Sequence, residues 1–122
     1  MFNFAAMNIE ELREYCLSLP QATEDMPFDD EALVFKVGGR MFCFASLTGD
    51  LKMNLKCDPD EAIEIRETFP AVTPGFHMNK KYWNTVLIDG SISDSMLKVW
   101  ILQSYKLVVA KLTKAERSRL GL

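Results

Sequence analysis

The sequence has few of the residue patterns that mark metal centres, disulfide frameworks and membrane spans. Its three cysteines, Cys16, Cys43 and Cys57, lie far apart, and His77 is its one histidine. An odd number of cysteines without a CxxC spacing argues against both a disulfide framework and a zinc site. No apolar run approaches the roughly 20 residues that a membrane helix needs, and the first residues do not resemble a signal peptide. We therefore expect a cytoplasmic protein with no membrane contact, metal or cofactor.

Signatures of catalysis are missing as well, since the sequence contains no P-loop, GxGxxG, GxSxG or HExxH motif. A thiolate nucleophile would need Cys43 or Cys57 beside His77. Cys57 directly precedes a predicted helix start, where its thiol could be more acidic than usual. We expect no enzymatic activity, and we expect His77 to be a surface or hydrogen-bonding residue. A small-molecule or metal site around His77 stays open as an alternative. Its further ligands would be acidic residues of the neighbouring connection: Asp25, Asp29, Asp30 and Glu31.

The chain does contain enough apolar residues for one folded domain. It has 122 residues, of which 48% are hydrophobic and 25% charged, as is typical of a globular protein. We expect a single domain over residues 1–122, with residues 1–7 as a loose N-terminal extension. The net charge of −3 is unevenly spread, because residues 9–31 are mostly acidic and residues 98–122 mostly basic. The two ends could attract each other, or they could form a polarised surface that steers a charged partner.

Hydrophobic periodicity and turn residues predict alternating helices and strands. Helices are expected to begin after four capping residues: Asn8, Asp58, Ser93 and Thr113. Strands are expected at 33–37, 40–45, 51–56 and 82–88, with a short edge strand near 22–25. Gly38-Gly39 predicts a tight hairpin turn between the first two long strands. Because tight turns join most of the strands, we predict an α+β fold with a mostly antiparallel sheet and helices on one face.

The other face of this sheet would be open to solvent. The strand 51–56 alternates strictly, so Lys52, Asn54 and Lys56 are expected to point away from the core. Lys36 would join them if its apolar neighbours along the strand point inward.

The segment from Pro74 to Val86 is the most unusual part of the chain. After a Pro-Gly turn it combines two lysines, one histidine, two asparagines and three aromatic residues. Polar groups this dense are costly to bury without partners, so we expect an exposed surface here. Lys80 and Lys81 beside Tyr82 and Trp83 suit nucleic acid, because lysine contacts phosphate and aromatic rings stack on bases. The alternative is that Trp83 belongs to the core and the lysines are merely exposed.

Five segments along nearly the whole chain match the pattern of a known family. They are Pro27-Phe28, Val34-Phe35-Lys36-Val37 with Met41-Phe42, Leu55-Lys56-Cys57-Asp58-Pro59, the segment 74–86, and Ser104-Tyr105 with Leu107-Val108. In these segments the chain resembles the MmcQ/YjbR-like proteins, small bacterial proteins described as having a double-wing DNA-binding motif on a CyaY-like fold. The resemblance implies an α+β fold with a curved antiparallel sheet. It also implies DNA binding, and it brings no catalytic residue with it.

Two functions follow as alternative hypotheses. The first is a DNA-binding module that contacts phosphates from the hairpins and the sheet face, with Trp83 stacking or bracing the surface. Its contact residues would be Lys36, Arg40, Lys52, Lys56, Lys80, Lys81 and Asn84. The overall acidity of the chain counts against tight non-specific binding of this kind. The second is a protein-interaction or regulatory module that binds a partner through the open sheet face or an edge strand.

Overall fold

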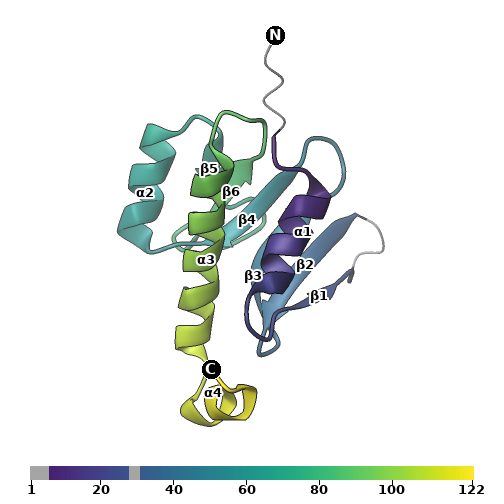
Figure 1. Cartoon of the computed structure of the whole chain (residues 1–122). Coiled ribbons are helices and arrows are strands. Elements are labelled where there is room, and N and C mark those ends of the chain that lie inside the picture. The colour runs from purple at the N-terminus through teal and green to yellow at the C-terminus, as the bar shows by residue number, and fades with distance from the viewer. Residues whose placement is uncertain (1–5, 28–30) are drawn as a thin grey trace.

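The computed structural model describes residues 6–27 and 31–122 (Figure 1). The helices and strands of this part are α1 (Ile9–Ser18), β1 (Thr23–Asp25), β2 (Ala32–Val37), β3 (Arg40–Ser46), β4 (Lys52–Lys56), α2 (Pro59–Thr68), β5 (Val72–Pro74), β6 (Trp83–Leu87), α3 (Asp94–Lys111) and α4 (Lys114–Leu120). The strands form one sheet in the order β1-β2-β3-β4-β6-β5, and every neighbouring pair is antiparallel. The predicted α+β fold with an antiparallel sheet is confirmed.

The element boundaries follow local signals in the sequence. Asn8 and Thr113 each form a capping box at a helix start. Asp58 caps α2 ahead of a proline at the first helical position. Gly38 and Gly39 both have positive φ angles, 59° and 78°, as a tight hairpin of the primed type requires. β5 was not predicted, because it has only three residues and its pairing with β6 is not visible in the local sequence.

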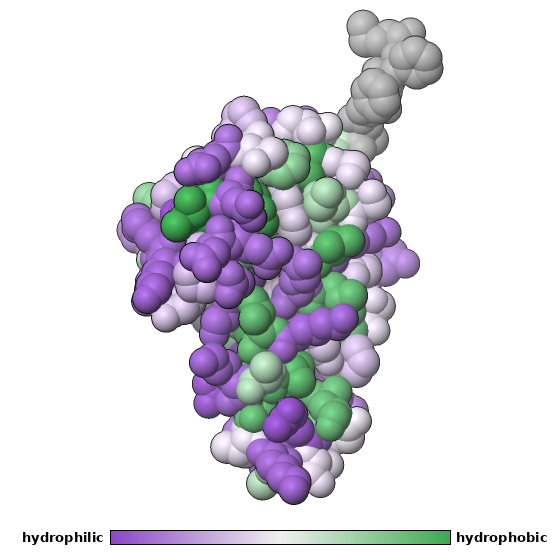
Figure 2. Space-filling view, turned by 90° about the vertical axis from the view of Figure 1, so that its left-hand side faces the viewer, coloured by the Kyte–Doolittle hydropathy of each residue, from purple (hydrophilic) through white to green (hydrophobic). Residues whose placement is uncertain are grey.

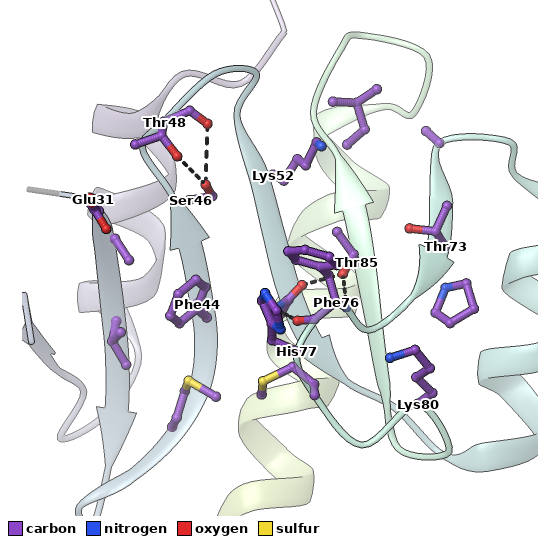
Figure 3. Close-up of a pocket in the computed structure, with 18 of the residues that line it drawn as sticks. Glu31, Phe44, Ser46, Thr48, Lys52, Thr73, Phe76, His77, Lys80 and Thr85 are labelled. Atoms are coloured by element: carbon purple, nitrogen blue, oxygen red, sulfur yellow. Dashed lines mark hydrogen bonds between the residues drawn. The ribbon is translucent and has the colours of Figure 1, made fainter. Parts of the chain in front are cut away.

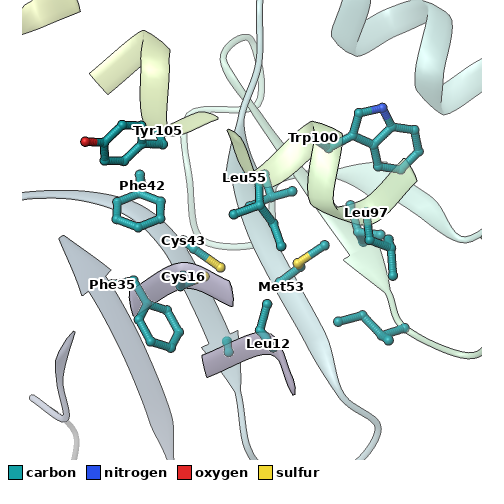
Figure 4. Close-up of a cluster of buried hydrophobic side chains, with 14 of the residues drawn as sticks. Leu12, Cys16, Phe35, Phe42, Cys43, Met53, Leu55, Leu97, Trp100 and Tyr105 are labelled. Atoms are coloured by element: carbon teal, nitrogen blue, oxygen red, sulfur yellow. The ribbon is translucent and has the colours of Figure 1, made fainter. Parts of the chain in front are cut away.

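Helices cover one face of the sheet and leave the other uncovered (Figure 1). The main core lies between this inner face and the helices (Figure 4). Phe42 on β3 meets Tyr105 on α3 edge-on, with 5.4 Å between ring centroids. Residues 1–5 of the predicted N-terminal extension lie outside the described residues. Met7, however, is only 2% exposed and belongs to the core, so the extension does not reach as far as predicted.

A bulge in the β2–β3 pair decides which side chains face inward. Phe35 pairs with Cys43, but the next residue of β2 pairs with Met41, so Phe42 is an extra residue in β3. As a result Phe42 and Cys43 both lie in the core, whereas Phe44 lies on the outer face (Figures 3 and 4). Strict alternation would have placed the two phenylalanines on the same face.

Ser104 of α3 joins the helix to the sheet. Its side chain is fully buried, and its hydroxyl donates to the carbonyl oxygen of Phe42 at 2.6 Å. The Ser104 hydroxyl oxygen in turn accepts the backbone N–H of Lys56 at 2.9 Å. One hydroxyl therefore satisfies polar backbone groups of two strands and fixes β3 and β4 against α3.

The side of the molecule that carries α2 is largely hydrophilic, with apolar side chains exposed in smaller patches (Figure 2). Within residues 6–27 and 31–122, no helix has the length and apolarity needed to cross a membrane.

Candidate binding site on the open face of the sheet

The outer face of the sheet is hollowed (Figure 3). The hollow has a volume of about 1310 Å³ and is lined by residues of β2, β3, β4, β5 and β6 and of the loop between β5 and β6. Its floor is mainly apolar and includes Val34, Met41, Phe44 and Leu87. A volume above the roughly 300–1,000 Å³ of ordinary small-molecule pockets suits part of a larger ligand. We call this space the outer hollow.

A small polar network holds the loop after β5 above the floor of the outer hollow. The Thr85 hydroxyl accepts the backbone N–H of Phe76 at 2.9 Å and donates to the Asn54 side-chain oxygen. The Asn54 amide in turn donates to the carbonyl oxygen of Phe76 at 3.2 Å. Asn54 and Thr85 are each 7% exposed, so both are buried polar residues with partners. The loop therefore has a defined position on the sheet.

Phe76 and His77 form an aromatic pair at this loop (Figure 3). Their ring centroids are 4.0 Å apart, and Phe76 is 66% exposed. His77 has a φ of 59°, a left-handed conformation that costs a non-glycine residue about 1–2 kcal/mol. The turn is closed by the N–H of Met78, which donates to the Gly75 carbonyl oxygen at 3.2 Å. Such strain at a defined, solvent-facing position is typical of functional loops.

Three of the predicted phosphate-contacting lysines line the outer hollow. Lys52 and Lys80 are exposed, and the Lys80 ammonium lies 3.4 Å from the Gly75 carbonyl oxygen. Lys36 also lines the hollow, but its ammonium pairs with the carboxylate of Asp25 on β1 at 3.4 Å. The acidic strand β1 therefore neutralises part of the charge that the sequence places on this face.

Arg40, Lys56 and Lys81 are not among the residues that line the outer hollow. Arg40 begins β3, next to the turn that packs on Leu112 after the end of α3, and Lys56 ends β4, where its N–H donates to Ser104 of α3. Lys81 lies over the ring of Tyr82, with 5.4 Å from its ammonium nitrogen to the ring centroid. The predicted basic surface is thus divided between the hollow and one end of the sheet.

Asn84 lies differently from the prediction of a contact surface. Asn84 is only 3% exposed, and its amide points inward to donate to the Ala62 carbonyl oxygen at 3.4 Å. It is therefore not part of a surface that contacts a ligand. Trp83 is partly buried and packs against Gly75, where an added Cβ would lie 2.8 Å from the Trp83 Cβ. Gly75 is needed for this close approach of the loop to β6.

The cysteines do not form a catalytic pair with His77. Cys43 is buried on the inner face, opposite the hollow that His77 lines. Burial, together with the neighbouring carboxylates of Glu61 and Asp58, raises the pKa of Cys57 to about 11. The expectation of an unusually acidic Cys57 thiol is therefore wrong, because burial and the nearby negative charges raise its pKa by more than the helix start lowers it.

The acidic residues do not assemble a metal site in the part of the chain that the structure describes. No group of three or more His, Cys, Asp or Glu side chains with a suitable arrangement occurs there. Glu31 and His77 both line the outer hollow, while Asp25 is engaged by Lys36. Asp29 and Asp30 lie outside the described residues.

Sequence reasoning did not single out Phe44, Phe76 and Thr85 as parts of the site. Phe76 and Thr85 belong to segment 74–86, for which the sequence predicted an exposed surface without distinguishing these two residues within it. The orientation of Phe44 depends on the bulge in β3, for which the sequence gives no local signal.

Comparisons with known proteins relate both the sequence and the fold to a bacterial family. The YjbR family model matches residues 17–107. The uncharacterised protein YbdF of Escherichia coli O157:H7 is 38% identical over 111 residues, covering 90% of this chain and 91% of YbdF. The uncharacterised protein YjbR of Escherichia coli K12 is 32% identical over 115 residues, covering 93% and 98%.

Solved structures show the same architecture. The crystal structure of Deinococcus radiodurans protein DR2400, a DUF419 domain, has a TM-score of 0.90 at 42% identity, covering all of this chain and 93% of that one. A Pseudomonas syringae protein shares the fold, with a TM-score of 0.74 at 22% identity over 84% of this chain and 99% of that one.

Proposed function

The chain belongs to the YjbR family, and we propose that it is a non-enzymatic binding module whose outer hollow takes single-stranded DNA. The observation that carries this proposal is the combination, in one open hollow, of exposed aromatic rings with lysine side chains. Proteins that bind single strands combine the same two elements, because bases stack on rings and phosphates contact cations. The family resemblance seen in the sequence points to DNA as the nucleic acid.

The aromatic pair supports stacking. Phe76 keeps two thirds of its surface exposed although the apolar floor of the hollow lies nearby. The adjacent His77 ring is tilted by 50° against the Phe76 ring, so it offers a second aromatic surface in a different orientation. Base–aromatic stacking contributes about 1–3 kcal/mol per base. A single strand offers unpaired base faces to these rings, whereas the bases of a duplex are already stacked on each other.

The lysines set the expected strength and salt dependence. Within the described residues, no carboxylate neutralises Lys52 or Lys80, so the charge of both is available to phosphate, although the Lys80 ammonium also donates to the Gly75 carbonyl oxygen. Lys36 contributes less because Asp25 already pairs with it. Each phosphate contact to a single strand gives a slope of about −0.7 in log K against log salt, so two contacts give about −1.4. We therefore expect weak binding, with modest salt dependence.

Fluorescence anisotropy with a labelled single-stranded oligonucleotide tests the proposal. Phe76→Ala should weaken binding roughly 10- to 100-fold through lost stacking. Lys52→Gln and Lys80→Gln should each weaken binding and lower the salt slope by about 0.7. Lys98→Gln on α3 is the matched control with the same loss of charge, and it should leave binding unchanged. Absence of binding at low salt, or equal losses in the control, would rule the proposal out.

A protein segment is the second candidate ligand. It is favoured by the apolar floor of the outer hollow, formed by Val34, Met41, Phe44 and Leu87. An extended peptide that buries apolar side chains on this floor would bind with little dependence on salt. Titration of a defined partner at two salt concentrations therefore separates the two functions, since only nucleic-acid binding should weaken as salt increases.

A further inference from the structure

We propose that Arg40, Lys56 and Lys111, together with the Tyr82 hydroxyl, form a second site that binds phosphate groups. The site lies at the end of the sheet beside the C-terminal half of α3, and none of the three cations lines the outer hollow. It does not depend on the function proposed for that hollow. Its ligand chemistry is a phosphate group, either in a small diphosphate or in a nucleic-acid backbone.

Contacts of these four residues and of their chain neighbours bring together the separate elements that carry them. The Lys56 N–H donates to Ser104 on α3, and the next amide, that of Cys57, donates to the Tyr82 carbonyl oxygen at 2.8 Å. Lys56 is thereby held between the middle of α3 and the start of β6.

The third contact comes from the β2–β3 turn. Gly38 packs so closely on Leu112 that an added Cβ would lie 2.7 Å from that side chain. The turn therefore rests against the end of α3, so that the start of β3, which is Arg40, lies near the end of α3, which is Lys111. Figure 1 shows the β2–β3 hairpin and the end of α3 at the same end of the molecule.

Lys56 is the unusual member of this group. It is partly buried, and among residues 6–27 and 31–122 no carboxylate pairs with it. Burial, and then the positive charges of Lys111 and Arg40, lower the pKa of its ammonium group. Three cations held close together repel one another, and an anion between them would remove that repulsion.

The neighbouring groups fit an anion. Arg40 can donate two parallel hydrogen bonds to phosphate, and Tyr82, which is 38% exposed, can donate its hydroxyl. Lys81 over the Tyr82 ring adds a further positive charge at the edge of the site. Glu116 of α4 is the acidic neighbour of Arg40; its carboxylate accepts the Thr113 N–H at 2.9 Å and offsets part of the Arg40 charge, whereas Lys56 has no such partner among the described residues.

Isothermal titration calorimetry with sodium pyrophosphate at constant ionic strength tests this site directly. We expect Lys56→Gln and Arg40→Gln to weaken pyrophosphate binding at least roughly tenfold, since each removes a charge-assisted contact. Lys98→Gln, with the same loss of charge elsewhere on α3, should bind as the parent chain does. Phe76→Ala should also leave pyrophosphate binding unchanged, which separates this site from the outer hollow.

Thermal unfolding without ligand distinguishes a binding role from a structural one. If Lys56 is held among cations for an anion, Lys56→Gln should keep or raise the melting temperature, because it relieves repulsion.

A parallel titration with an oligonucleotide identifies the source of the phosphate. Binding of the oligonucleotide alone, weakened by Arg40→Gln, supports a nucleic-acid backbone, and pyrophosphate binding supports a small diphosphate. If neither ligand loses affinity in Lys56→Gln or in the exposed Arg40→Gln, the proposal is overturned.

Discussion

The two faces of the sheet are made by the same strands, yet they differ in what covers them. On β4, Met53 and Leu55 are 0% and 3% exposed beneath the helices. The alternating residues of the same strand, Lys52 and Asn54, face the outer hollow, which a loop covers in part and none of the described helices covers. Because side chains alternate along a strand, substitutions on one face leave the other largely intact. The fold can therefore be stabilised on the inner face while the outer face remains available for binding.

The largest expected effect compares two phenylalanines of β3. Phe42→Ala should lower the free energy of unfolding by about 3–5 kcal/mol, because it leaves a cavity beneath Tyr105. Phe44→Ala on the outer face should cost only about 1 kcal/mol, because its site is open to solvent and leaves no closed cavity. Urea unfolding of both variants measures the difference. Equal losses would mean that the outer face contributes to stability as much as the core does.

A smaller effect compares one hydroxyl on each face. Ser104→Ala should cost about 1–3 kcal/mol, because it leaves the Phe42 carbonyl and the Lys56 N–H buried without a partner. Thr85→Val should cost about 1 kcal/mol, because the one backbone N–H and the one side-chain oxygen that lose their partner lie beside the open outer hollow.

Hydrogen exchange sharpens this comparison. Thr85→Val should speed exchange at the Phe76 amide without affecting Lys56, and Ser104→Ala should do the reverse. Faster exchange at both amides in either variant would show that the two faces are coupled.

The smallest expected effect concerns the two non-glycine residues with a left-handed backbone in the described chain. Gln21 and His77 have φ angles of 60° and 59°. Replacing either by glycine should raise the free energy of unfolding by about 0.5 kcal/mol, because relief of backbone strain slightly exceeds the added chain entropy. Only His77→Gly should also weaken oligonucleotide binding. A loss of stability in His77→Gly, but not in Gln21→Gly, would show instead that the His77 ring holds the loop in place.

Local signals in the sequence were enough for most of the fold. The capping residues Asn8, Asp58, Ser93 and Thr113 mark the starts of the four described helices. Gly38-Gly39 marks the hairpin, because few other residues adopt two successive positive φ angles. Lys36 was predicted to face outward if its apolar neighbours point inward. Phe35 and Val37 do lie in the core, and Lys36 lines the outer hollow.

The candidate site was less predictable, because it depends on contacts between distant residues. The β3 bulge turns Phe42 inward and Phe44 outward, although both occupy equivalent positions in an alternating pattern. Asn84 looks like a surface residue in a polar segment, but β6 runs beneath α2 and the Asn84 side chain bonds to that helix. The grouping of Arg40 and Lys56 with Lys111 likewise depends on how α3 crosses the sheet.

The two outermost strands bear on how the molecule behaves at high concentration. β1 and β5 have only three residues each; β1 carries two acidic side chains, and β5 ends in Pro74, which has no N–H to donate. A neighbouring copy that extended the sheet would find an edge of only three residues, with charged side chains, at one border and a missing donor at the other. The chain can thus leave a whole sheet surface uncovered with little tendency toward fibril growth.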